Sequence, residues 1–441
     1  MTKITFESVA RLEEIGEISI QTGPFGTQLK ASEYTEMGTP VINVRNIGYR
    51  IEKDAALERI PERVVEKLKQ HKLLAGDIVF GRKGAVDRHL IVKKKQSGWV
   101  QGSDCIRIRL KSKNLDRDFL SYFFLTEGHK KWMEAQGAFG ATMGSLNQGI
   151  IRRISFPDFP FNIQRKIAAV LSAYDDLIEN NNRRIAILEK MAEELYREWF
   201  VRLRFPGHEK TKIIKGIPEG WEVKNVGKVF ERYIGGGWGE DFQMPNNPVG
   251  AFVIRGTDIP DLKTGKYKLP PFRFHKQTNF ASRVLKVGDI IFEVAGGSKT
   301  QLLGRSLLIS EGIHNFCQKK LICASFCKLI RPAISPFYLS SFLNAFYDCG
   351  LVGIFQTQST GISNYHFEDF VKFQTIAVPS KELLNQFDAT MEKIVSQKDN
   401  FAQQNWFLSN SRDKLLSRLM SGKIDLENLD IQFPASMQEE E

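Results

Sequence analysis

The chain contains a long internal repeat, and this feature limits the possible folds more than any other. The segment LLAGDIVFGRKG (73–84) returns as VLKVGDIIFEVAGG (284–297), so Asp77 and Asp289 are 212 positions apart (289 − 77). Two further pairs keep a similar offset, namely PVINVRNI with AFVIRGTDI, which contain Arg45 and Arg255, and ISFP with IAVP, which end at Pro157 and Pro379. Solenoid repeats have periods of roughly 20–50 residues. The sequence therefore predicts two related modules of domain size, which suit a ligand with two similar ends.

The composition favours an anionic ligand. With 441 residues, the chain has room for about three domain-sized pieces that can each bury a core. The formal net charge is +11, while the charged fraction of 26% is ordinary for a globular protein. A basic protein attracts polyanions, of which duplex nucleic acid is the commonest. A well-solvated basic protein without such a ligand is the alternative interpretation.

The sequence is typical of a cytoplasmic protein. The first 17 residues, MTKITFESVARLEEIGE, lack the apolar segment of a signal peptide. No stretch reaches the roughly 18 apolar residues that span a bilayer, so we expect no contact with a membrane. Five cysteines, an odd number, fit a reducing compartment better than a disulfide framework.

A segment without proline or glycine extends from Asn162 to about Arg204. Its apolar residues recur at steps of three and four, which is the coiled-coil signal, held here for about four heptads. The predicted seam consists of Leu171, Tyr174, Ile178, Asn181, Ile185, Leu188, Ala192, Leu195 and Trp199. Asn181 is its polar member, and a buried asparagine in a seam usually fixes the register and orientation of the helices.

A second helical stretch is predicted from Lys381 to about Leu426. One column of its seam is apolar throughout and consists of Phe387, Ile394, Phe401, Leu408 and Leu415. The other column consists of Met391, Lys398, Asn405, Arg412 and Leu419. Because three members of this column are polar, the second helix has the weaker seam.

The two seams bury each other most economically if the helices pack together. A helix of about 40 residues is roughly 60 Å long, and a contact of roughly 28 residues spans about 42 Å. We therefore predict an α+β fold, in which two similar mixed α/β domains are separated by a two-helix antiparallel coiled coil with a pseudo-twofold axis. One turn of DNA measures about 34–36 Å, so the domains would read one face of a duplex about one turn apart. The predicted boundaries are 1–158 (first domain), 159–207 (first helix), 208–380 (second domain), 381–427 (second helix) and 428–441 (flexible acidic tail).

At the first junction between domain and helix, Gln164, Ile167, Leu171, Asp175 and Ile178 form the pattern Gln-x-x-Ile-x-x-x-Leu-x-x-x-Asp-x-x-Ile. With this pattern the chain resembles the specificity subunits of type I restriction-modification systems, whose members carry it. Three further strings are similar to the family, namely IPEGWEVKNVG (217–227), the Gly-Asp-Ile strand of each module and SGKI (421–424). The second junction departs from the pattern, because it keeps Gln386 but lacks the Ile and Asp spacing.

The resemblance covers almost the whole length and implies a function. Such subunits carry no chemistry themselves and read a split DNA sequence, one half for each target-recognition domain. Two modification subunits, which bind S-adenosylmethionine and methylate adenine, pack against the spacer helices. ATP-dependent motor-nuclease (restriction) subunits join for cleavage. The resemblance thus places S-adenosylmethionine, ATP and Mg on the partner subunits and no cofactor on this chain.

The sequence contains no complete catalytic or metal-binding motif that would favour a different function. NNPVG (246–250) has one proline and no aromatic residue, whereas an adenine methyltransferase needs Asn/Asp-Pro-Pro-aromatic. Ser298 replaces the last glycine of a phosphate-binding loop. Asp289 and Glu293 could form a metal pair, but we favour a turn that enters a buried strand.

A zinc site is a further possibility that the residue spacing disfavours. His314, Cys317, Cys323 and Cys327 lie close together in the sequence, but their spacing and their apolar surroundings in ICASFCKLI differ from the usual Cys-x2–4-Cys pairs. We therefore expect buried free cysteines and no metal.

Base readout requires Arg, Lys, Asn, Gln, Ser or Thr side chains near base edges, with further cations on phosphates. The candidates in the first module are Arg45, Arg82, Lys83, Arg88 and His89, the phosphate-steering residues Lys93, Lys94 and Lys95, and Thr142, Ser145 and Asn147 of a glycine-rich loop. The candidates in the second module are Arg255, Thr257, Lys299, Gln301, Arg305, Thr360, Ser363 and Asn364. The resemblance places a Gly-Thr-type loop near the DNA. The alternative for each residue is an ordinary solvated loop side chain.

A second class of function is consistent with the same features. The chain could be a scaffold whose duplicated modules bind proteins, with the coiled coil as a strut. A steep salt dependence of duplex binding distinguishes the DNA-reading function from the scaffold.

Overall fold

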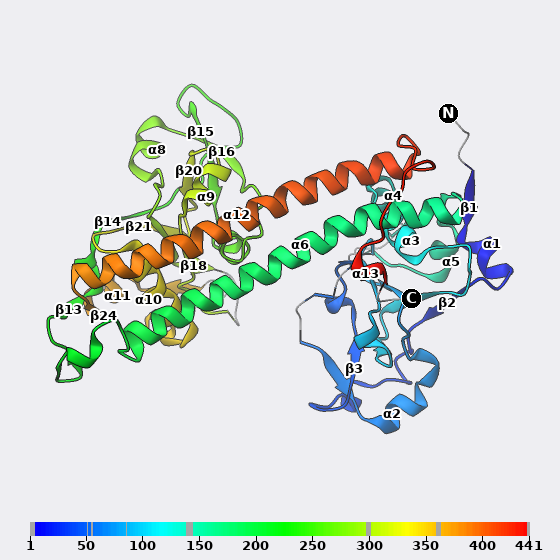
Figure 1. Cartoon of the computed structure of the whole chain (residues 1–441), viewed down its shortest axis with the longest axis horizontal. Helices are drawn as coiled ribbons and strands as arrows, with labels where there is room; N and C mark the ends of the chain where they lie inside the picture. Colours follow the sequence, from blue (N-terminus) through cyan, green and yellow to red (C-terminus); the bar gives the residue numbers. More distant parts are fainter. Residues whose placement is uncertain are drawn as a thin grey trace. The chain divides into compact units, whose positions relative to one another are not determined.

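The computed structural model describes residues 5–50, 52–53, 56–84, 86–137, 144–296, 301–358 and 363–438. The chain divides into two units, Met1–Asp176 with Ser409–Glu441, and Leu177–Leu408. Each unit contains one of the repeated modules together with part of both long helices (Figure 1). None of the helices in the described part of the chain combines the length and the apolar character that crossing a membrane requires.

Module 1, which precedes the first long helix, is built on a five-stranded sheet with the order β2-β9-β6-β7-β4. Its strands are β2 (Ile18–Thr22), β9 (Cys105–Leu110), β6 (Ile78–Gly81), β7 (His89–Ile91) and β4 (Tyr49–Arg50). A smaller sheet has the order β5-β3-β8, in which β3 is antiparallel to β5 and parallel to β8. The remaining strands are β5 (Glu58–Ile60), β3 (Thr39–Ile42), β8 (Val100–Gln101), and the pair β1 (Phe6–Ser8) and β10 (Ser155–Pro157).

Module 2 repeats this topology except for strand β4, which has no counterpart in the described main sheet of module 2. Its main sheet has the order β14-β21-β17-β19, which corresponds to β2-β9-β6-β7, and its smaller sheet has the order β16-β15-β20. As in module 1, the middle strand β15 has one antiparallel and one parallel neighbour. The strands are β14 (Phe230–Gly235), β21 (Cys327–Pro332), β17 (Ile290–Glu293), β19 (Ser306–Leu308), β16 (Phe272–His275), β15 (Val249–Ile254), β20 (Leu321–Cys323), β13 (Glu222–Asn225) and β24 (Thr375–Val378). The repeat found in the sequence is therefore confirmed as a repeat of the fold.

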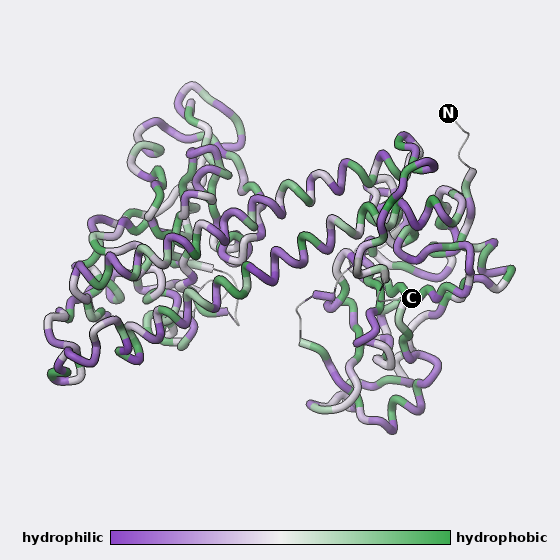
Figure 2. Tube along the Cα trace, in the orientation of Figure 1, coloured by the Kyte–Doolittle hydropathy of each residue, from purple (hydrophilic) through white to green (hydrophobic). Residues whose placement is uncertain are grey.

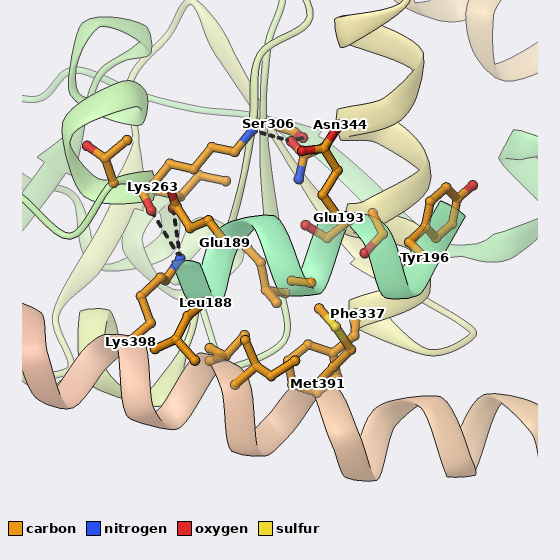
Figure 3. Close-up of a pocket in the computed structure, with 18 of the residues that line it drawn as sticks. Leu188, Glu189, Glu193, Tyr196, Lys263, Ser306, Phe337, Asn344, Met391 and Lys398 are labelled. Atoms are coloured by element: carbon orange, nitrogen blue, oxygen red, sulfur yellow. Dashed lines mark hydrogen bonds and ion pairs between the residues drawn. The ribbon is translucent and has the colours of Figure 1, made fainter. Parts of the chain in front are cut away.

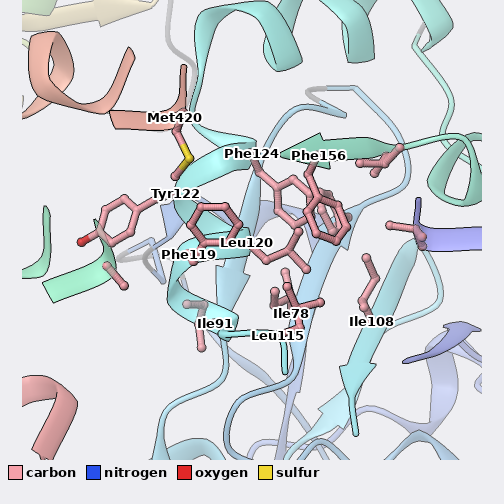
Figure 4. Close-up of a cluster of buried hydrophobic side chains, with 14 of the residues drawn as sticks. Ile78, Ile91, Ile108, Leu115, Phe119, Leu120, Tyr122, Phe124, Phe156 and Met420 are labelled. Atoms are coloured by element: carbon pink, nitrogen blue, oxygen red, sulfur yellow. The ribbon is translucent and has the colours of Figure 1, made fainter. Parts of the chain in front are cut away.

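Helices cover the main sheet of module 1 and complete its core. Phe119, Tyr122, Phe124 and Phe156 are fully buried there (Figure 4). Phe80 is fully buried in the same core. Burial of such a side chain stabilises the fold by about 1.5–3 kcal/mol. The helices of this module are α1 (Val9–Glu14), α2 (Glu62–Lys67), α3 (Arg117–Phe124), α4 (Glu127–Gly137) and α5 (Gln148–Arg152).

The sequence FLSYFFLTEGHKKWMEAQ (119–136) predicts a single helix, and this prediction is wrong, because the structure has α3 and α4 in its place. The break lies at Leu125–Thr126. The hydroxyl of Thr126 accepts a hydrogen bond from the amide of His129 (3.4 Å), so this side chain starts a new helix.

Module 2 has its own helices and core. Phe292 and Phe370 stack with 5.7 Å between their ring centroids, and both side chains are fully buried. The helices are α7 (Ile259–Lys263), α8 (Gln277–Arg283), α9 (Glu311–Phe316), α10 (Pro336–Asp348) and α11 (Phe367–Phe373).

The two long helices are α6 (Phe161–Tyr196), which continues as the π-helical turn η5 (Arg197–Val201), and α12 (Lys381–Met420). Apolar and polar residues alternate along both (Figure 2). In unit 2 the helices pack against each other and run in opposite directions, because Asn181 faces Asn405 while Glu189, further along α6, faces Lys398, which lies earlier in α12. The antiparallel pairing that we predicted is therefore confirmed within unit 2, and in unit 1 Asp175 faces Arg412.

The polar residues of the α12 seam each meet a polar partner on α6. Arg412 forms an ion pair with Asp175 (2.5 Å), and Lys398 forms one with Glu189 (3.7 Å). The amide of Asn181 donates to the side-chain oxygen of Asn405 (3.0 Å), and both side chains are buried. A slip of one helix along the other would leave these groups unpaired in a buried seam, so the pairs define the register.

The seam also packs onto module 2 around a cavity of about 740 Å³ (Figure 3). Lys263 of α7 reaches into this region and donates to the side-chain oxygen of Asn344 (3.1 Å). Lys398 donates to the backbone oxygen of Lys263 (3.0 Å). Burial raises the pKa of Glu189 and lowers the pKa of Lys263. The hydrogen bond from Lys398 of α12 to Lys263 of α7 joins the helix seam to module 2.

The family-type glutamine fixes the start of α6. The buried side chain of Gln164 accepts a hydrogen bond from the amide of Asp116 (2.9 Å) and donates to the carbonyl of Phe159 (2.8 Å). Gln386 at the second junction is exposed. There Asp388 accepts a hydrogen bond from Ser335 instead. The start of α12 is therefore joined to module 2 by other residues than those that join α6 to module 1.

The end of the chain differs from our prediction in two ways. Helix α12 ends at Met420, before the predicted boundary at 427. Residues 428–438 are not a flexible tail, since a short helix, α13 (Ala435–Gln438), forms and Met437 is buried in the core of unit 1. Apolar side chains of this segment, Ile431 and Phe433, pack on the same core. Residues 439–441 lie outside the described residues.

Candidate nucleic-acid interface

The aspartate of each Gly-Asp-Ile motif has a structural function. Asp77 is 1% exposed, and both of its oxygens accept hydrogen bonds from Arg109 of the neighbouring strand β9 (2.7 Å each). Asp289 accepts the same pair of bonds from Arg331 of β21 (2.8 and 2.7 Å). The turn that enters a buried strand, which we favoured over a metal pair, is thus the observed arrangement.

In module 1, loops that are distant in the sequence are hydrogen-bonded to one another. The amide of Gly23, after β2, donates to the carbonyl of Cys105 (2.9 Å). The amide of Arg82, after β6, donates to the carbonyl of Asp104 (2.7 Å), and its own carbonyl accepts from Leu146 (2.7 Å). The basic loop and the end of the glycine-rich loop, which the sequence nominated separately, therefore lie side by side.

Module 2 repeats these three contacts. The amide of Gly236 donates to the carbonyl of Cys327, the amide of Val294 donates to the carbonyl of Phe326, and the carbonyl of Val294 accepts from Tyr365, each at 2.9 Å. The loop pairing extends into a small sheet of the strands β18 (Ala295–Gly296), β23 (Ser363–Tyr365) and β22 (Gln356–Gln358).

A fourth contact, present in both modules, joins the loop that follows strand β3 or β15 to the other loops. The amide of Gly102 donates to the carbonyl of Ile42 (2.9 Å), and Ala324 donates to Ile254 (2.8 Å). We call the resulting sets of loops the rims. Rim 1 consists of residues 23–26, 43–46, 82–84, 102–105 and 144–147, and rim 2 consists of residues 236–239, 255–258, 294–296, 324–327 and 363–365.

Half of the described candidates of module 1 lie on rim 1, namely Arg45, Arg82, Lys83, Ser145 and Asn147. Arg45 pairs with Glu58 (3.0 Å) and Lys83 with Asp104 (3.2 Å), but these side chains are exposed, so the pairs are weak. Arg82 is half-buried and Ser145 is exposed. The side-chain oxygen of Asn147 caps α5 by accepting from the amide of Ile150 (2.9 Å).

Two candidates of module 1, His89 and Arg88, lie outside rim 1 and are buried or half-buried. His89 is fully buried and hydrogen-bonded to Ser121 (2.8 Å), so this residue belongs to the core. Burial, together with Arg50, lowers the pKa of His89 well below its usual range. Arg88 is half-buried with its guanidinium over the ring of Tyr49 (5.7 Å to the centroid). Lys93, Lys94 and Lys95 are exposed on the 3-10 helix η4 (Lys94–Gln96) and the residue before it, and Thr142 lies outside the described residues.

In module 2, several candidates lie on rim 2 with different accessibility. Arg255 pairs with Asp258 (2.7 Å) at the start of the 3-10 helix η8 (Gly256–Asp258), and Thr257 is exposed beside it. Asn364 is exposed, whereas Ser363, 3% exposed, is too deeply buried to contact DNA.

Arg305 is committed to a buried ion pair. Its guanidinium donates to both oxygens of Glu293 (2.8 and 2.5 Å), and these side chains are 15% and 5% exposed. The guanidinium of Arg305 is thus engaged within module 2. Gln301 is exposed in the same loop, while Lys299 and Thr360 lie outside the described residues.

Sequence reasoning missed exposed aromatic residues on the rims. Phe25 on rim 1, and Trp238 and Phe326 on rim 2, are 61%, 38% and 56% exposed. It also missed a polar cavity of about 280 Å³ beside Trp238, lined in part by Lys276 and Arg283. The repeat could have revealed the two aromatic residues as equivalent, because Phe25 and Trp238 are 213 positions apart (238 − 25), close to the offset of Asp77 and Asp289.

No metal-binding cluster is found among the described residues, in which no three His, Cys, Asp or Glu side chains gather closely enough to hold an ion. Cys317, Cys323 and Cys327 are buried as free thiols. Burial raises the pKa of Cys317 and of Cys323 to about 12, so these side chains remain protonated.

These features define a duplicated protein with two similar mixed α/β modules and a paired-helix seam. Residues 5–190 match the family model described as Type I restriction modification DNA specificity domain. This match confirms the resemblance to type I specificity subunits over that part of the chain. The match agrees with the expectation of a recognition subunit that is not itself the enzyme.

Individual relatives extend this likeness over nearly the whole chain. The type I restriction enzyme MjaIX specificity subunit of Methanocaldococcus jannaschii is 22% identical over 442 residues, which cover 96% of this chain and 94% of that protein. The putative type I restriction enzyme MjaX specificity subunit of the same organism is 24% identical over 58% of each chain. A crystal structure of the type I restriction-modification S subunit from M. genitalium has a TM-score of 0.54 at 15% identity and covers 95% of this chain and 96% of its own. This likeness shows that the fold is shared.

Proposed function

We propose that the chain is the DNA-recognition subunit of a type I restriction-modification complex and that each module reads one half of a split site. The observation that carries this proposal is the pair of rims, which the same backbone hydrogen bonds assemble in both modules. Each rim presents exposed polar and basic side chains on loops supported by a buried sheet. Base readout requires this arrangement, in which polar side chains that can reach base edges are held at fixed positions.

Charge supports the same proposal. The net charge is +11, and exposed cations are available on both modules, namely Arg45, Lys83, Lys93, Lys94, Lys95 and Arg255. Phosphate contacts of this kind make binding depend steeply on salt, because each contact releases condensed counterions.

The long helices support the proposed docking of two modification subunits. Leu177, Ile187 and Met191 of α6 and Phe407 of α12 are each more than half exposed, although they lie beside a buried seam. Exposed apolar residues on a rigid element often mark a protein interface. In this proposal S-adenosylmethionine, ATP and Mg are bound by the partner subunits, and the restriction subunits join the assembled methyltransferase.

The test is to map methylated adenines in a host genome that carries this chain and its modification partner. We expect a two-part motif with an unread gap. Exchange of residues 1–158 for the first module of another specificity subunit should change one half of the motif and leave the other intact. Changes in both halves, or the absence of any motif, would overturn the proposal.

A salt titration addresses the scaffold alternative. For the complex with the modification partner, a plot of log K against log salt for the mapped duplex should have a steep negative slope. A scaffold would instead form a salt-insensitive protein complex that does not bind the duplex.

A further inference from the structure

We infer that Phe25 and Trp238 are equivalent base-stacking residues, each of which places its ring against a base of the half-site that its module reads. This inference rests on the proposed function, since it names contacts within the proposed interface. Neither aromatic residue is among the DNA-contact candidates that the sequence nominates.

The two residues occupy the same place in the repeated fold. Each follows the first strand of the main sheet by the same interval, two residues beyond Gly23 and Gly236, respectively. Both glycine amides donate across the rim (2.9 Å). A Cβ atom on Gly23 would collide with the carbonyl of Gly102, and one on Gly236 with the carbonyls of Cys323 and Ala324. Only glycine permits this approach, so the aromatic loop is held against the rim in both modules.

Both rings are exposed beside a cation. Phe25 is 61% exposed, with the guanidinium of Arg82 at 5.8 Å from its ring centroid. Trp238 is 38% exposed, with the guanidinium of Arg273, which also forms an ion pair with Asp241, at 4.4 Å. An exposed aromatic face next to arginine is suited to a ligand that combines a flat π system with an anionic backbone, which is the chemistry of a nucleotide.

In module 2, hydrogen-bonding groups surround the aromatic residue. Trp238 lines the cavity of about 280 Å³ together with Asn279, Lys276 and His275. His275 is 5% exposed, and its Nε2 atom has no hydrogen-bond partner. A base stacked on Trp238 would therefore have polar groups near its edges. Partial unstacking of a base step by an apolar side chain is an established way to bend or open DNA.

The experiment uses the complex with the modification partner and a duplex of its mapped site, with 2-aminopurine placed in one half-site or the other. Trp238→Ala should weaken binding about 10- to 100-fold, with an unchanged slope of log K against log salt. It should also change the 2-aminopurine fluorescence of the bound complex in its own half-site alone. Phe25→Ala should do the same for the other half-site, and Trp238→Phe should restore most of the affinity.

Phe6→Ala and Phe373→Ala are the matched controls, because these rings are 65% and 62% exposed but lie outside the rims. Affinity of the Trp238 and Phe25 variants equal to that of the controls would overturn the inference. A loss of affinity with a smaller salt slope would also overturn it, since it would assign the effect to phosphate contacts. If the wild-type complex fails to bind a specific duplex, the proposed function fails instead, so the two failures are distinguishable.

Discussion

At the residue scale, Asp77 and Asp289 connect the repeated sequence to the repeated fold. Each is buried at the turn before a central strand and paired with an arginine of the adjacent strand, Arg109 or Arg331. The hydrogen bond that each arginine donates to its aspartate raises the pKa of that arginine. In each module this ion pair holds the central strand, β6 or β17, whose end leads into the rim.

Replacement of Asp77 by alanine tests this function. Loss of one partner of a buried ion pair leaves an uncompensated charge, and because Arg109 is partly exposed we expect a loss of about 3 kcal/mol in the stability of module 1. Hydrogen exchange of peptides from β6 and β9 measures the effect locally. Asp104→Ala, which breaks an exposed pair with Lys83, should cost less than about 1 kcal/mol. Equal effects of the two substitutions would contradict the structural function of Asp77.

His129 gives module 1 a sensitivity to acid. Burial lowers its pKa to about 4, and the ring packs against Phe124 and Trp132. The unfolded chain protonates this histidine near pH 6.5, so stability is fully present above that pH and is lost as the pH falls toward 4. The contribution is about 1.4 kcal/mol for each pH unit in this window.

We therefore expect His129→Phe to behave like the wild type at pH 7 and to lose less stability between pH 6.5 and pH 4. Hydrogen exchange or urea unfolding at several pH values gives the slope. Parallel slopes for the two proteins would show that His129 is not the group that titrates.

At the element scale, the polar pairs on α6 and α12 decide how the helices meet. Asp175 accepts hydrogen bonds from Arg412 of α12 (2.5 Å) and from the hydroxyl of Tyr122 of α3 (2.6 Å), and Arg50 lies within ion-pair distance (3.9 Å). One carboxylate thus joins the seam to the core of module 1. The match of Asp175 to the family pattern has a physical reason in this network.

Asp175→Ala should loosen α6 and α12 within unit 1. Arg412 and Arg50 would lose a partner while they remain mostly buried, and we expect a cost of about 2–3 kcal/mol. Hydrogen exchange of residues 161–176 and 409–420 should accelerate, while that of module 2 should not change. Glu179→Ala removes an exposed pair with Arg183 on the same helix and should change the exchange little. Similar acceleration in both variants would argue against the network.

At the scale of the whole molecule, the proposed function makes the paired helices a spacer between two readers. Deletion of residues 176–182 and 404–410 removes one heptad from each helix and keeps Asp175 and Arg412. At 1.5 Å per residue this shortens the spacer by about 10 Å, or about three base pairs. The gap in the methylated motif should shrink accordingly while both half-sites keep their sequence. An unchanged gap would mean that the helices do not set the spacing.

The sequence alone determined the features that depend on local pattern. The duplication, the Gly-Asp-Ile strands and the apolar columns of both long helices follow from residue order, because strand and helix periodicity are local properties. Its errors were also local in origin. The break before Thr126 depends on a side-chain cap, and the tail packs through Ile431, Phe433 and Met437, whose burial no local pattern shows.

Tertiary structure decided which side chains are available. His89 and Ser363 have the chemistry of DNA contacts but are buried, while Arg305 is paired with Glu293. Phe25 and Trp238 look like core residues in the sequence but are exposed on the rims. The rims themselves are made by hydrogen bonds between loops far apart in the chain. Residue order fixes the repeat, but only the packed fold determines which loops meet, because that depends on contacts over long sequence distances.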